Sequence, residues 1–211
     1  FNGFGGSTIL YSAHFPRFHP SDFSVKSLDN VAEDWPLNYS DLKPHFDENE
    51  KMMGVAGLVG DPAYPEYSSL LPPIPMGAMG QEMSKAFNKK KWHWWPSYSA
   101  INTSKRNNRS DCINLGPCNT GCSQGAKGSV DITYWPEAKL NGVEVYTESR
   151  VYEITLNSKG LADGVLYLDR NGTEFKCKAK IIIVACSGIG TPRLLLNSKS
   201  SAFPDGLLND N

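Results

Sequence analysis

A glycine-rich turn near the N-terminus carries the first residues whose types and spacing could do chemistry. Two adjacent glycines are followed by two hydroxyl side chains, in the order Gly5, Gly6, Ser7 and Thr8. Because glycine has no Cβ, paired glycines let a backbone approach a diphosphate closely, and the hydroxyls that follow can donate to phosphate oxygens. The same four residues also suit an ordinary flexible turn, so the pattern alone leaves both interpretations open.

A second segment of this kind lies near the other end of the chain. An uninterrupted apolar run, Ile181–Ala185, is predicted to be a strand buried on both faces of a parallel sheet. Small residues follow it and lead into a helix predicted over 191–197, with Thr191 as its cap and Pro192 at its first position. Open α/β sheets bind dinucleotides where such a strand ends and a helix begins. Two such segments in one chain favour a dinucleotide site over two unrelated turns.

Three of the five cysteines, Cys112, Cys118 and Cys122, crowd into one short loop. An odd, clustered set fits a disulfide framework poorly and suits a metal site, a tight loop or a chance arrangement. Cys177 and Cys186 fall in or beside expected strands and are interpreted as small core residues.

The elements that must position these segments can be predicted from periodicity and turn signals. Helices are expected over 41–53, 81–89 and 129–141, and strands over 143–147, 150–157, 164–169 and 174–179. Asn171 and Gly172 form a strong hairpin signal before the last of these strands.

Composition excludes two classes of function. The chain has 211 residues, with 21 basic and 22 acidic side chains and a net charge of -1. This near-neutral balance of charge does not indicate a nucleic-acid-binding protein. No apolar run approaches the length of a membrane span. The basic run 89–91, which precedes three tryptophans, is interpreted as a solvated turn beside an aromatic cluster.

The two glycine-containing segments, with what lies between them, resemble the glucose–methanol–choline (GMC) family of FAD-dependent oxidoreductases. The sequence Asn-Gly-Phe-Gly-Gly-Ser-Thr at 2–8 resembles the family's second flavin signature. Residues 185–198 resemble its strand and turn of the type Ala-Ala-Gly-x-x-x-Thr-Pro-x-Leu-Leu-x-x-Ser. The segments 34–46 and 125–136 also resemble segments of the family, and they occur in the same order along the chain. The resemblance covers nearly the whole chain and is weakest over 55–110.

The resemblance implies an FAD site assembled from separated segments, with the first turn lying along the pyrophosphate and isoalloxazine. Backbone at Val151 is expected to face the adenine. The expected cofactor-binding residues are Gly5, Gly6, Ser7, Thr8, Val151, Ala185, Ser187 and Gly188. Leu10 stands closest to the position at which relatives with covalently tethered flavin carry a histidine, so the FAD is expected to be noncovalent.

The implied fold is α/β, a Rossmann-like FAD-binding domain with an inserted substrate-side region. Residues 1–34 and 111–211 are assigned to the FAD-binding domain and residues 35–110 to the insertion. The family's Gly-x-Gly-x-x-Gly turn is expected before Phe1 and its catalytic histidine beyond Asn211. The chain is therefore expected to be a piece truncated at both ends, with no catalytic residue and no activity of its own. The four histidines present are interpreted as loop or surface residues.

The cysteine loop resembles a loop in the flavoprotein subunits of bacterial sugar dehydrogenases, where three cysteines hold a [3Fe-4S] cluster. The resemblance implies Cys112, Cys118 and Cys122 as the iron ligands. Related family members carry cysteines here without a cluster, and Cys118 and Cys122 also suit the packing of a tight loop. Both interpretations stay open.

The expected reaction is oxidation of a CH–OH group of an alcohol or sugar by hydride transfer to flavin, in a bacterial dehydrogenase or oxidase. The expected partners are a small-molecule alcohol or sugar and, for a dehydrogenase, a cytochrome or small subunit that takes the electrons. The alternative is an inactive remnant or a flavin-fold binding module without turnover. The compartment, cytoplasm or periplasm, is left open.

Overall fold

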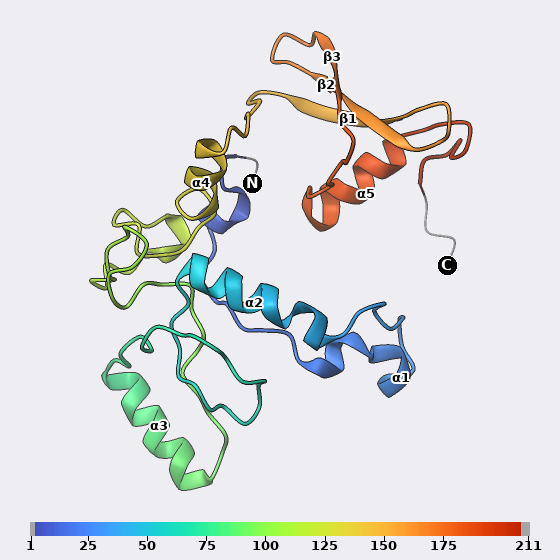
Figure 1. Ribbon diagram of the computed structural model, residues 1–211. Helices are drawn as coiled ribbons and strands as arrows, with labels where there is room; N and C mark the ends of the chain where they lie inside the picture. Colours follow the sequence, from blue (N-terminus) through green and yellow to red (C-terminus); the bar gives the residue numbers. More distant parts are fainter. Residues whose placement is uncertain (1–2, 208–211) are drawn as a thin grey trace. The chain divides into compact units, whose positions relative to one another are not determined.

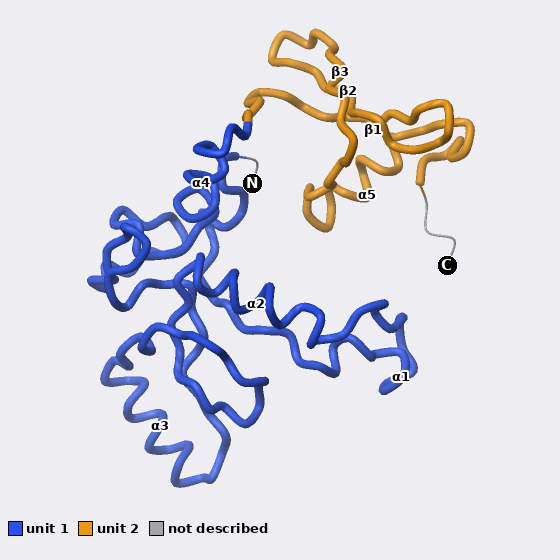
Figure 2. The backbone as a smooth tube through the Cα atoms, in the orientation of Figure 1, with its two compact units in different colours: residues 1–143 blue, residues 144–211 orange. Residues whose placement is uncertain are grey.

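The computed structural model describes residues 3–207. The chain divides into two compact units, Phe1–Val143 and Glu144–Asn211 (Figure 2). The first unit holds the helices α1 (Val25–Asp29), α2 (Tyr39–Met53), α3 (Ala78–Lys90) and α4 (Tyr134–Leu140), and the short 3₁₀ helices η1 (Gly6–Ile9), η2 (Pro20–Phe23) and η3 (Cys118–Thr120). The second unit holds the strands β1 (Arg150–Leu156), β2 (Ala162–Leu168) and β3 (Glu174–Lys178), followed by α5 (Ser187–Asn197) (Figure 1).

Extended loop segments, with no named strand among them, build most of the core of the first unit. They meet at isolated bridges, such as Ala56 with both Leu71 and Ser99. Seven buried residues form the centre of this core: Ala13, Met53, Val55, Tyr67, Tyr98, Ala100 and Ile101. The backbone packs so closely here that a Cβ on Gly128 would lie 2.4 Å from the Met53 carbonyl oxygen. Segments far apart in sequence therefore hold one another in place.

The longest helix, α2, begins where a capping residue satisfies its free amides. The Asn38 side chain accepts from the backbone N–H groups of Ser40, at 2.9 Å, and Asp41, at 3.3 Å. The Asp41 carboxylate accepts in return from the Asn38 amide at 2.8 Å, which completes a capping box. The helix ends at Gly54, whose φ of +73° is typical of a glycine C-cap. The helix expected over 41–53 is confirmed and begins two residues earlier than predicted, after its cap at Asn38.

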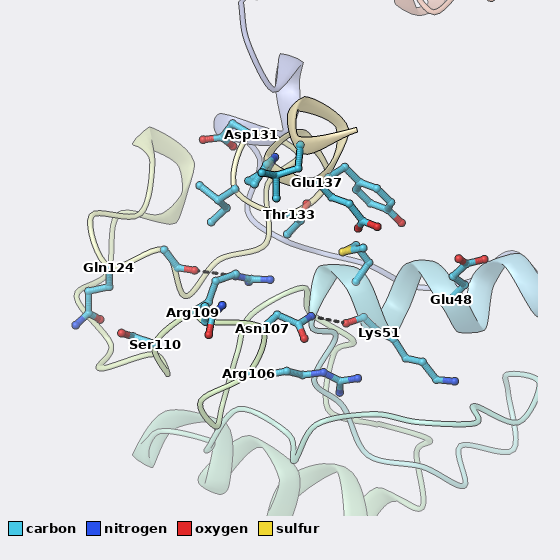
Figure 3. A pocket seen from close by; sticks show the side chains of 17 residues that line it. Glu48, Lys51, Arg106, Asn107, Arg109, Ser110, Gln124, Asp131, Thr133 and Glu137 are labelled. Atoms are coloured by element: carbon cyan, nitrogen blue, oxygen red, sulfur yellow. Dashed lines mark hydrogen bonds between the residues drawn. The ribbon is translucent and has the colours of Figure 1, made fainter. Parts of the chain in front are cut away.

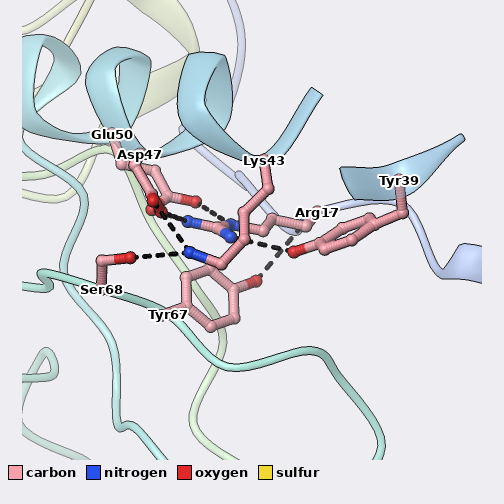
Figure 4. A network of polar contacts seen from close by, with 7 residues as sticks. All are labelled: Arg17, Tyr39, Lys43, Asp47, Glu50, Tyr67 and Ser68. Atoms are coloured by element: carbon pink, nitrogen blue, oxygen red, sulfur yellow. Dashed lines mark hydrogen bonds and ion pairs between the residues drawn. The ribbon is translucent and has the colours of Figure 1, made fainter. Parts of the chain in front are cut away.

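A buried polar network ties α2 to the N-terminal segment (Figure 4). Arg17 is 5% exposed and makes two hydrogen bonds of 2.6 Å to the Glu50 carboxylate. It also donates to Asp47 and to the Tyr39 hydroxyl, and its guanidinium lies 4.5 Å from the centre of the Tyr67 ring. A bidentate pair of this kind fixes both partners. Residues from 1–34 thus pack within one unit with residues from 35–110. The predicted division into an FAD domain and an insertion stays a prediction.

The second unit is an antiparallel sheet in the order β1-β2-β3 with α5 against β1. The hairpin predicted at Asn171 and Gly172 is confirmed. The Asp169 carboxylate accepts from the Asn171 and Thr173 amides, both at 2.8 Å, and Gly172 has a φ of +80°. The Ser198 hydroxyl, just after α5, accepts from the Ile154 amide of β1 at 2.9 Å.

Two predicted strands are wrong in this structure. Residues 143–147 and 181–185 belong to no strand, and Ile181 and Ile183 are 80% and 86% exposed. A strand needs a neighbour for its backbone hydrogen bonds, and residues 3–207 offer none to either run. The described sheet is antiparallel, so the parallel sheet predicted around 181–185 is not seen among these residues. Cys177 and Cys186 are exposed, so their interpretation as core residues is also wrong.

Two helix boundaries differ from the prediction. The helix expected over 129–141 is confined to α4; residues 130–133 form turns and Ser129 has no regular structure. α5 begins at Ser187, with Cys186 as its N-cap in place of the predicted Thr191. None of the helices found between residues 3 and 207 is both long enough and apolar enough to cross a membrane.

Candidate functional site

The predicted glycine turn lies in the first unit, apart from Asn2, which falls outside the described residues. Gly5 and Gly6 have φ angles of +85° and +59°, in the left-handed region that favours glycine. Gly5 is buried, and a Cβ placed on it would come within 2.9 Å of the Asp131 Cβ. Leaving aside its two chain neighbours, a Cβ on Gly6 would meet no atom of the described residues within 4 Å. Gly5 therefore packs inward, whereas Gly6 presents bare backbone to open space.

The two hydroxyls of this turn differ in their contacts. Ser7 is exposed. The Thr8 hydroxyl donates to the Gly5 carbonyl at 2.5 Å and accepts from the Val130 amide at 3.0 Å. Since a hydroxyl has one proton, Thr8 already directs its proton to the turn itself. Its predicted bond to a cofactor stays a prediction, and the contact observed here is structural.

A buried lysine anchors the segment that follows the turn. Lys127 is 2% exposed, and its ammonium donates to the carbonyls of Ile9 at 2.6 Å, Tyr11 at 3.0 Å and Cys118 at 2.7 Å. These bonds use all three of its protons. Burial lowers the pKa of Lys127, because it disfavours the charged form. The bonds connect the glycine turn to the cysteine loop.

The partly buried Tyr11 and the buried Arg109 also stabilise this region. The Tyr11 hydroxyl donates to the Gly128 carbonyl at 2.5 Å, and burial raises the pKa of Tyr11 to about 12. Arg109 is 7% exposed and donates to the carbonyls of Met53, Gly125 and Ala126 at 2.9, 3.0 and 2.8 Å. Burial lowers the pKa of Arg109. Two buried cations in this unit are thus bonded to backbone carbonyls.

An open cleft of about 890 Å³ lies between α2, α4 and the loop around residues 106–110 (Figure 3). Its charged lining residues are Glu48, Lys51, Arg106, Arg109, Asp131 and Glu137. Asp131 lines the cleft and also packs against Gly5, although no residue of the glycine turn itself lines the cleft. Its Oδ1 atom is buried and has no hydrogen-bond partner.

The sequence interpretation missed Lys127, Arg109 and Asp131. One signal was available for Lys127, because it stands alone within a run of small residues, Gly125–Ser129. Small neighbours let backbones pack closely, and a single lysine among them is a candidate for a buried cation with carbonyl partners. Arg109 and Asp131 carry no such local signal.

The second predicted turn lies in the other unit and is far more open. Ala185, Ser187 and Gly188 are exposed, and a Cβ on Gly188 would meet no atom within 4 Å. The Thr191 hydroxyl accepts from the Cys186 amide at 3.2 Å. The first turn of α5 contains no acidic residue, so its free amides keep their positive character.

Val151, the predicted adenine contact, lies on β1 of this same unit. It pairs with Tyr167 on β2, and the register shifts between Val151 and Glu153. Its side chain is 41% exposed. The eight predicted cofactor residues are therefore divided between the two units, four in each.

The three loop cysteines do not form a metal site in the structure. Cys112 and Cys118 pack against the core of the first unit. Burial acts to raise the pKa of Cys122, but backbone N–H groups of residues 124–127 outweigh it and lower that pKa. No disulfide links the cysteines. Between residues 3 and 207, no three His, Cys, Asp or Glu side chains come together to hold a metal ion. The iron-sulfur interpretation gains no support from this geometry.

A comparison with known protein families identifies the chain. The family model described as GMC oxidoreductase matches residues 2–202. The chain belongs to the GMC oxidoreductase family. The resemblance seen in the sequence is thereby confirmed, and GMC oxidoreductases are FAD-binding enzymes of α/β fold.

Several curated relatives of this GMC oxidoreductase align over nearly the whole chain. 2-Methyl-1,2-propanediol dehydrogenase from Mycolicibacterium austroafricanum is 41% identical over 100% of the chain and 39% of the relative. Fructose dehydrogenase large subunit from Gluconobacter japonicus is 26% identical over 98% of the chain and 39% of the relative. Paromamine 6'-oxidase from Streptomyces fradiae is 29% identical over 97% of the chain and 38% of the relative. The chain thus spans about two fifths of the length of these relatives.

Proposed function

We propose that the protein containing this chain oxidises a CH–OH group of an alcohol or sugar, with FAD as the hydride acceptor. The family match and the names of the relatives, two dehydrogenases and an oxidase, support an enzyme over an inactive remnant. The flavin, when bound, supplies the hydride chemistry. The residues of this chain bind and orient it.

The observation that carries the proposal is the bare, left-handed backbone at Gly6. Apart from its two chain neighbours, no atom of residues 3–207 lies within 4 Å of a Cβ placed on it, and the turn is held in shape by Thr8 and Lys127. A rigid turn with room for a ligand is what a flavin needs for close approach of backbone. We assign Gly5, Gly6, Ser7 and Thr8 to the first half of the FAD site.

The start of α5 forms the second half of the proposed site. The exposed backbone around Gly188 and the free amides of the first helical turn suit an anion such as a pyrophosphate. Ala185, Ser187 and Gly188 are assigned to this half, with Val151 on the adenine side.

The substrate is proposed to be a small alcohol or sugar, because the related dehydrogenases are named for a diol and for fructose. The fructose dehydrogenase relative is a large subunit, which supports a further subunit as an electron-transfer partner. Among residues 3–207 the three loop cysteines are not arranged to hold an iron-sulfur cluster. No electron-transfer step is therefore assigned to these cysteines.

Valine substitutions at the two glycines test the FAD site in the full-length protein. Gly6→Val and Gly188→Val should each lose bound FAD, because the new side chain occupies the space of the cofactor. FAD per chain is measured from the absorbance of the purified protein, together with the unfolding temperature.

Matched controls separate this effect from backbone strain. Gly60 also has a positive φ, +89°, and nothing within 4 Å of a Cβ, so Gly60→Val carries the same strain away from the site. Gly77 precedes α3 in open space with an ordinary φ, and Gly77→Val is the control for Gly188→Val. Lys159→Ala serves as an exposed surface control. Stoichiometric FAD in both Gly6→Val and Gly188→Val would refute the site.

A further inference from the structure

A row of large apolar side chains runs along the helix α3. Met79, Met83 and Phe87 follow one another at intervals of four residues, which places them on one side of the helix. Such a row normally packs against a core, but Met79 is 78% exposed and Met83 is 49% exposed, and the buried residue of α3 is instead Ser84. Loops join the helix to the rest of the first unit at both ends (Figure 1). The described residues therefore leave most of this row uncovered.

The C-terminal turn of α3 adds a tryptophan to this row. Lys91 has a left-handed φ of +56°, so the chain turns back and the Trp92 amide donates to the Phe87 carbonyl at 3.0 Å. The centre of the Trp92 ring lies 6.0 Å from that of Phe87, and Trp92 is 61% exposed. Trp94 is fixed to the same turn, because its indole N–H donates to the Asn88 side-chain oxygen at 2.8 Å. The complete apolar row consists of Met79, Met83, Phe87 and Trp92.

Positive charge is concentrated on the same helix and its C-terminal turn. The basic residues of this segment are Lys85, Lys89, Lys90 and Lys91. Lys85 pairs with Glu82 at 2.6 Å, whereas among residues 3–207 no acidic side chain forms an ion pair with the other three lysines. Four lysines and one glutamate give the segment 78–92 a net charge of +3, while the whole chain has a net charge of -1. The apolar row is thus accompanied by three unpaired cations.

This combination favours an anionic lipid surface over a protein partner. Tryptophan suits the boundary between an apolar phase and water, and the flexible side chain of methionine adapts to a fluid apolar phase. The long apolar stems of lysine let its ammonium reach phosphate groups beside a buried apolar row. A protein partner would need carboxylates at fixed positions opposite three consecutive lysines, whereas anionic lipids move laterally and gather beneath them.

We propose that α3 docks the protein on an anionic lipid surface. The helix lies in the plane of the interface, with its apolar row inserted at the boundary between head groups and acyl chains. Lys89, Lys90 and Lys91 contact the lipid phosphates. The basic run 89–91, interpreted from the sequence as a solvated turn, is in this account the electrostatic part of a docking surface. The proposal does not depend on the FAD site.

Sedimentation of the full-length protein with lipid vesicles tests the electrostatic contact. The protein should bind vesicles of phosphatidylcholine and phosphatidylglycerol in equal parts, and should bind pure phosphatidylcholine vesicles far less. Lys89→Gln with Lys90→Gln should weaken binding to the anionic vesicles about thirtyfold, because each lysine near such a surface contributes a factor of about five. Lys26→Gln with Lys105→Gln removes the same charge from exposed positions of the same unit and should leave binding nearly unchanged.

The apolar row is tested by substitution and by fluorescence. Met79→Gln with Met83→Gln retains helix propensity and should weaken binding to the anionic vesicles about tenfold. Leu28→Gln, at a leucine that is 63% exposed on α1, is the control. Anionic vesicles should shift the tryptophan emission to shorter wavelength, because Trp92 leaves water. Trp92→Phe should remove most of this shift, whereas Trp35→Phe, at a tryptophan that is also 63% exposed, should keep it.

Several results would overturn the proposal. Absence of binding to the anionic vesicles, or equal weakening by the lysine variant and its control, would mean that α3 does not contact lipid. A lower unfolding temperature of the methionine variant than of Leu28→Gln, measured without lipid, would mean that another part of the protein covers the apolar row. A dimer in light scattering that the methionine variant dissociates would mean that a second copy of the protein covers it.

Discussion

The two glycine turns of this protein are built in opposite ways. The turn at Gly5 and Gly6 is held by hydrogen bonds to groups more than a hundred residues away: the Lys127 ammonium donates to the Ile9 carbonyl, and the Val130 amide donates to the Thr8 hydroxyl. The turn at Gly188 is exposed, and the side-chain hydrogen bond described for it is the local one from the Cys186 amide to Thr191. The first turn is therefore preorganised before a ligand arrives, whereas the second depends on what covers it.

Among the substitutions that test this comparison, replacing Lys127 should lower the free energy of unfolding most. Lys127→Met leaves the carbonyls of three partly buried residues without their charged donor, so the free energy of unfolding should fall by about 4 kcal/mol. Denaturant unfolding of the full-length protein measures it, with Lys159→Met as the surface control. A loss no larger than that of the control would show that Lys127 does not hold the turn.

Loss of the Thr8 hydroxyl should lower the free energy of unfolding less than loss of the Lys127 ammonium does. It should lower it more than loss of the Thr191 hydroxyl in the second turn. Thr8→Val deletes the bonds to the Gly5 carbonyl and from the Val130 amide, and should lower the free energy of unfolding by about 2 kcal/mol. Unfolding curves of the single variant suffice. An effect below that of Thr191→Val would reverse the comparison.

The first unit contains two tyrosines with raised pKa values, of which Tyr98 is buried and Tyr11 is partly buried. Burial raises the pKa of both Tyr11 and Tyr98 to about 12, above the value of about 10 in an unfolded chain. Both groups therefore contribute stability below pH 10 that is lost as the pH rises through 12. Within residues 3–207 the Tyr98 hydroxyl has no hydrogen-bond partner, whereas the Tyr11 hydroxyl donates to the Gly128 carbonyl.

The two phenylalanine variants should therefore differ at neutral pH. Tyr11→Phe should lower the free energy of unfolding by about 1 kcal/mol, because the Gly128 carbonyl loses its donor, and Tyr98→Phe should leave it nearly unchanged. Both should lessen the decline in stability between pH 10 and 12, measured by unfolding at each pH. Equal losses at pH 7 would contradict the assigned contacts.

The smallest effect is expected at the second turn. Thr191→Val removes the acceptor of the exposed Cys186 amide, which water can replace, so the free energy of unfolding should change by about 0.5 kcal/mol or less. Thermal unfolding of the Thr191→Val and Thr8→Val variants compares the two losses of stability. A loss of about 2 kcal/mol would mean that Thr191 holds its turn as firmly as Thr8 does.

Local signals predicted much of the fold, and long-range contacts escaped prediction. The helix α2 and the hairpin at Asn171 and Gly172 follow from caps and turn residues within a few positions. The strand predicted over 181–185 failed because a strand depends on a partner that composition does not reveal. Lys127 was missed for a similar reason, since its partner Ile9 stands 118 residues away. The glycines proposed for the FAD site could be named from the sequence because the pattern that suggests them is local, and their role stays a prediction.

Hydrogen–deuterium exchange of the full-length protein, with and without FAD, tests the central contrast most directly. The first four amides of α5 have no intrahelical partner, whereas the Leu10 amide that closes η1 donates to the Ser7 carbonyl at 3.0 Å. We predict that residues 7–10 are protected already in the apoprotein, and that residues 187–190 become protected when FAD binds. Equal, rapid exchange of both segments in the apoprotein, or no change at 187–190 on adding FAD, would contradict the account.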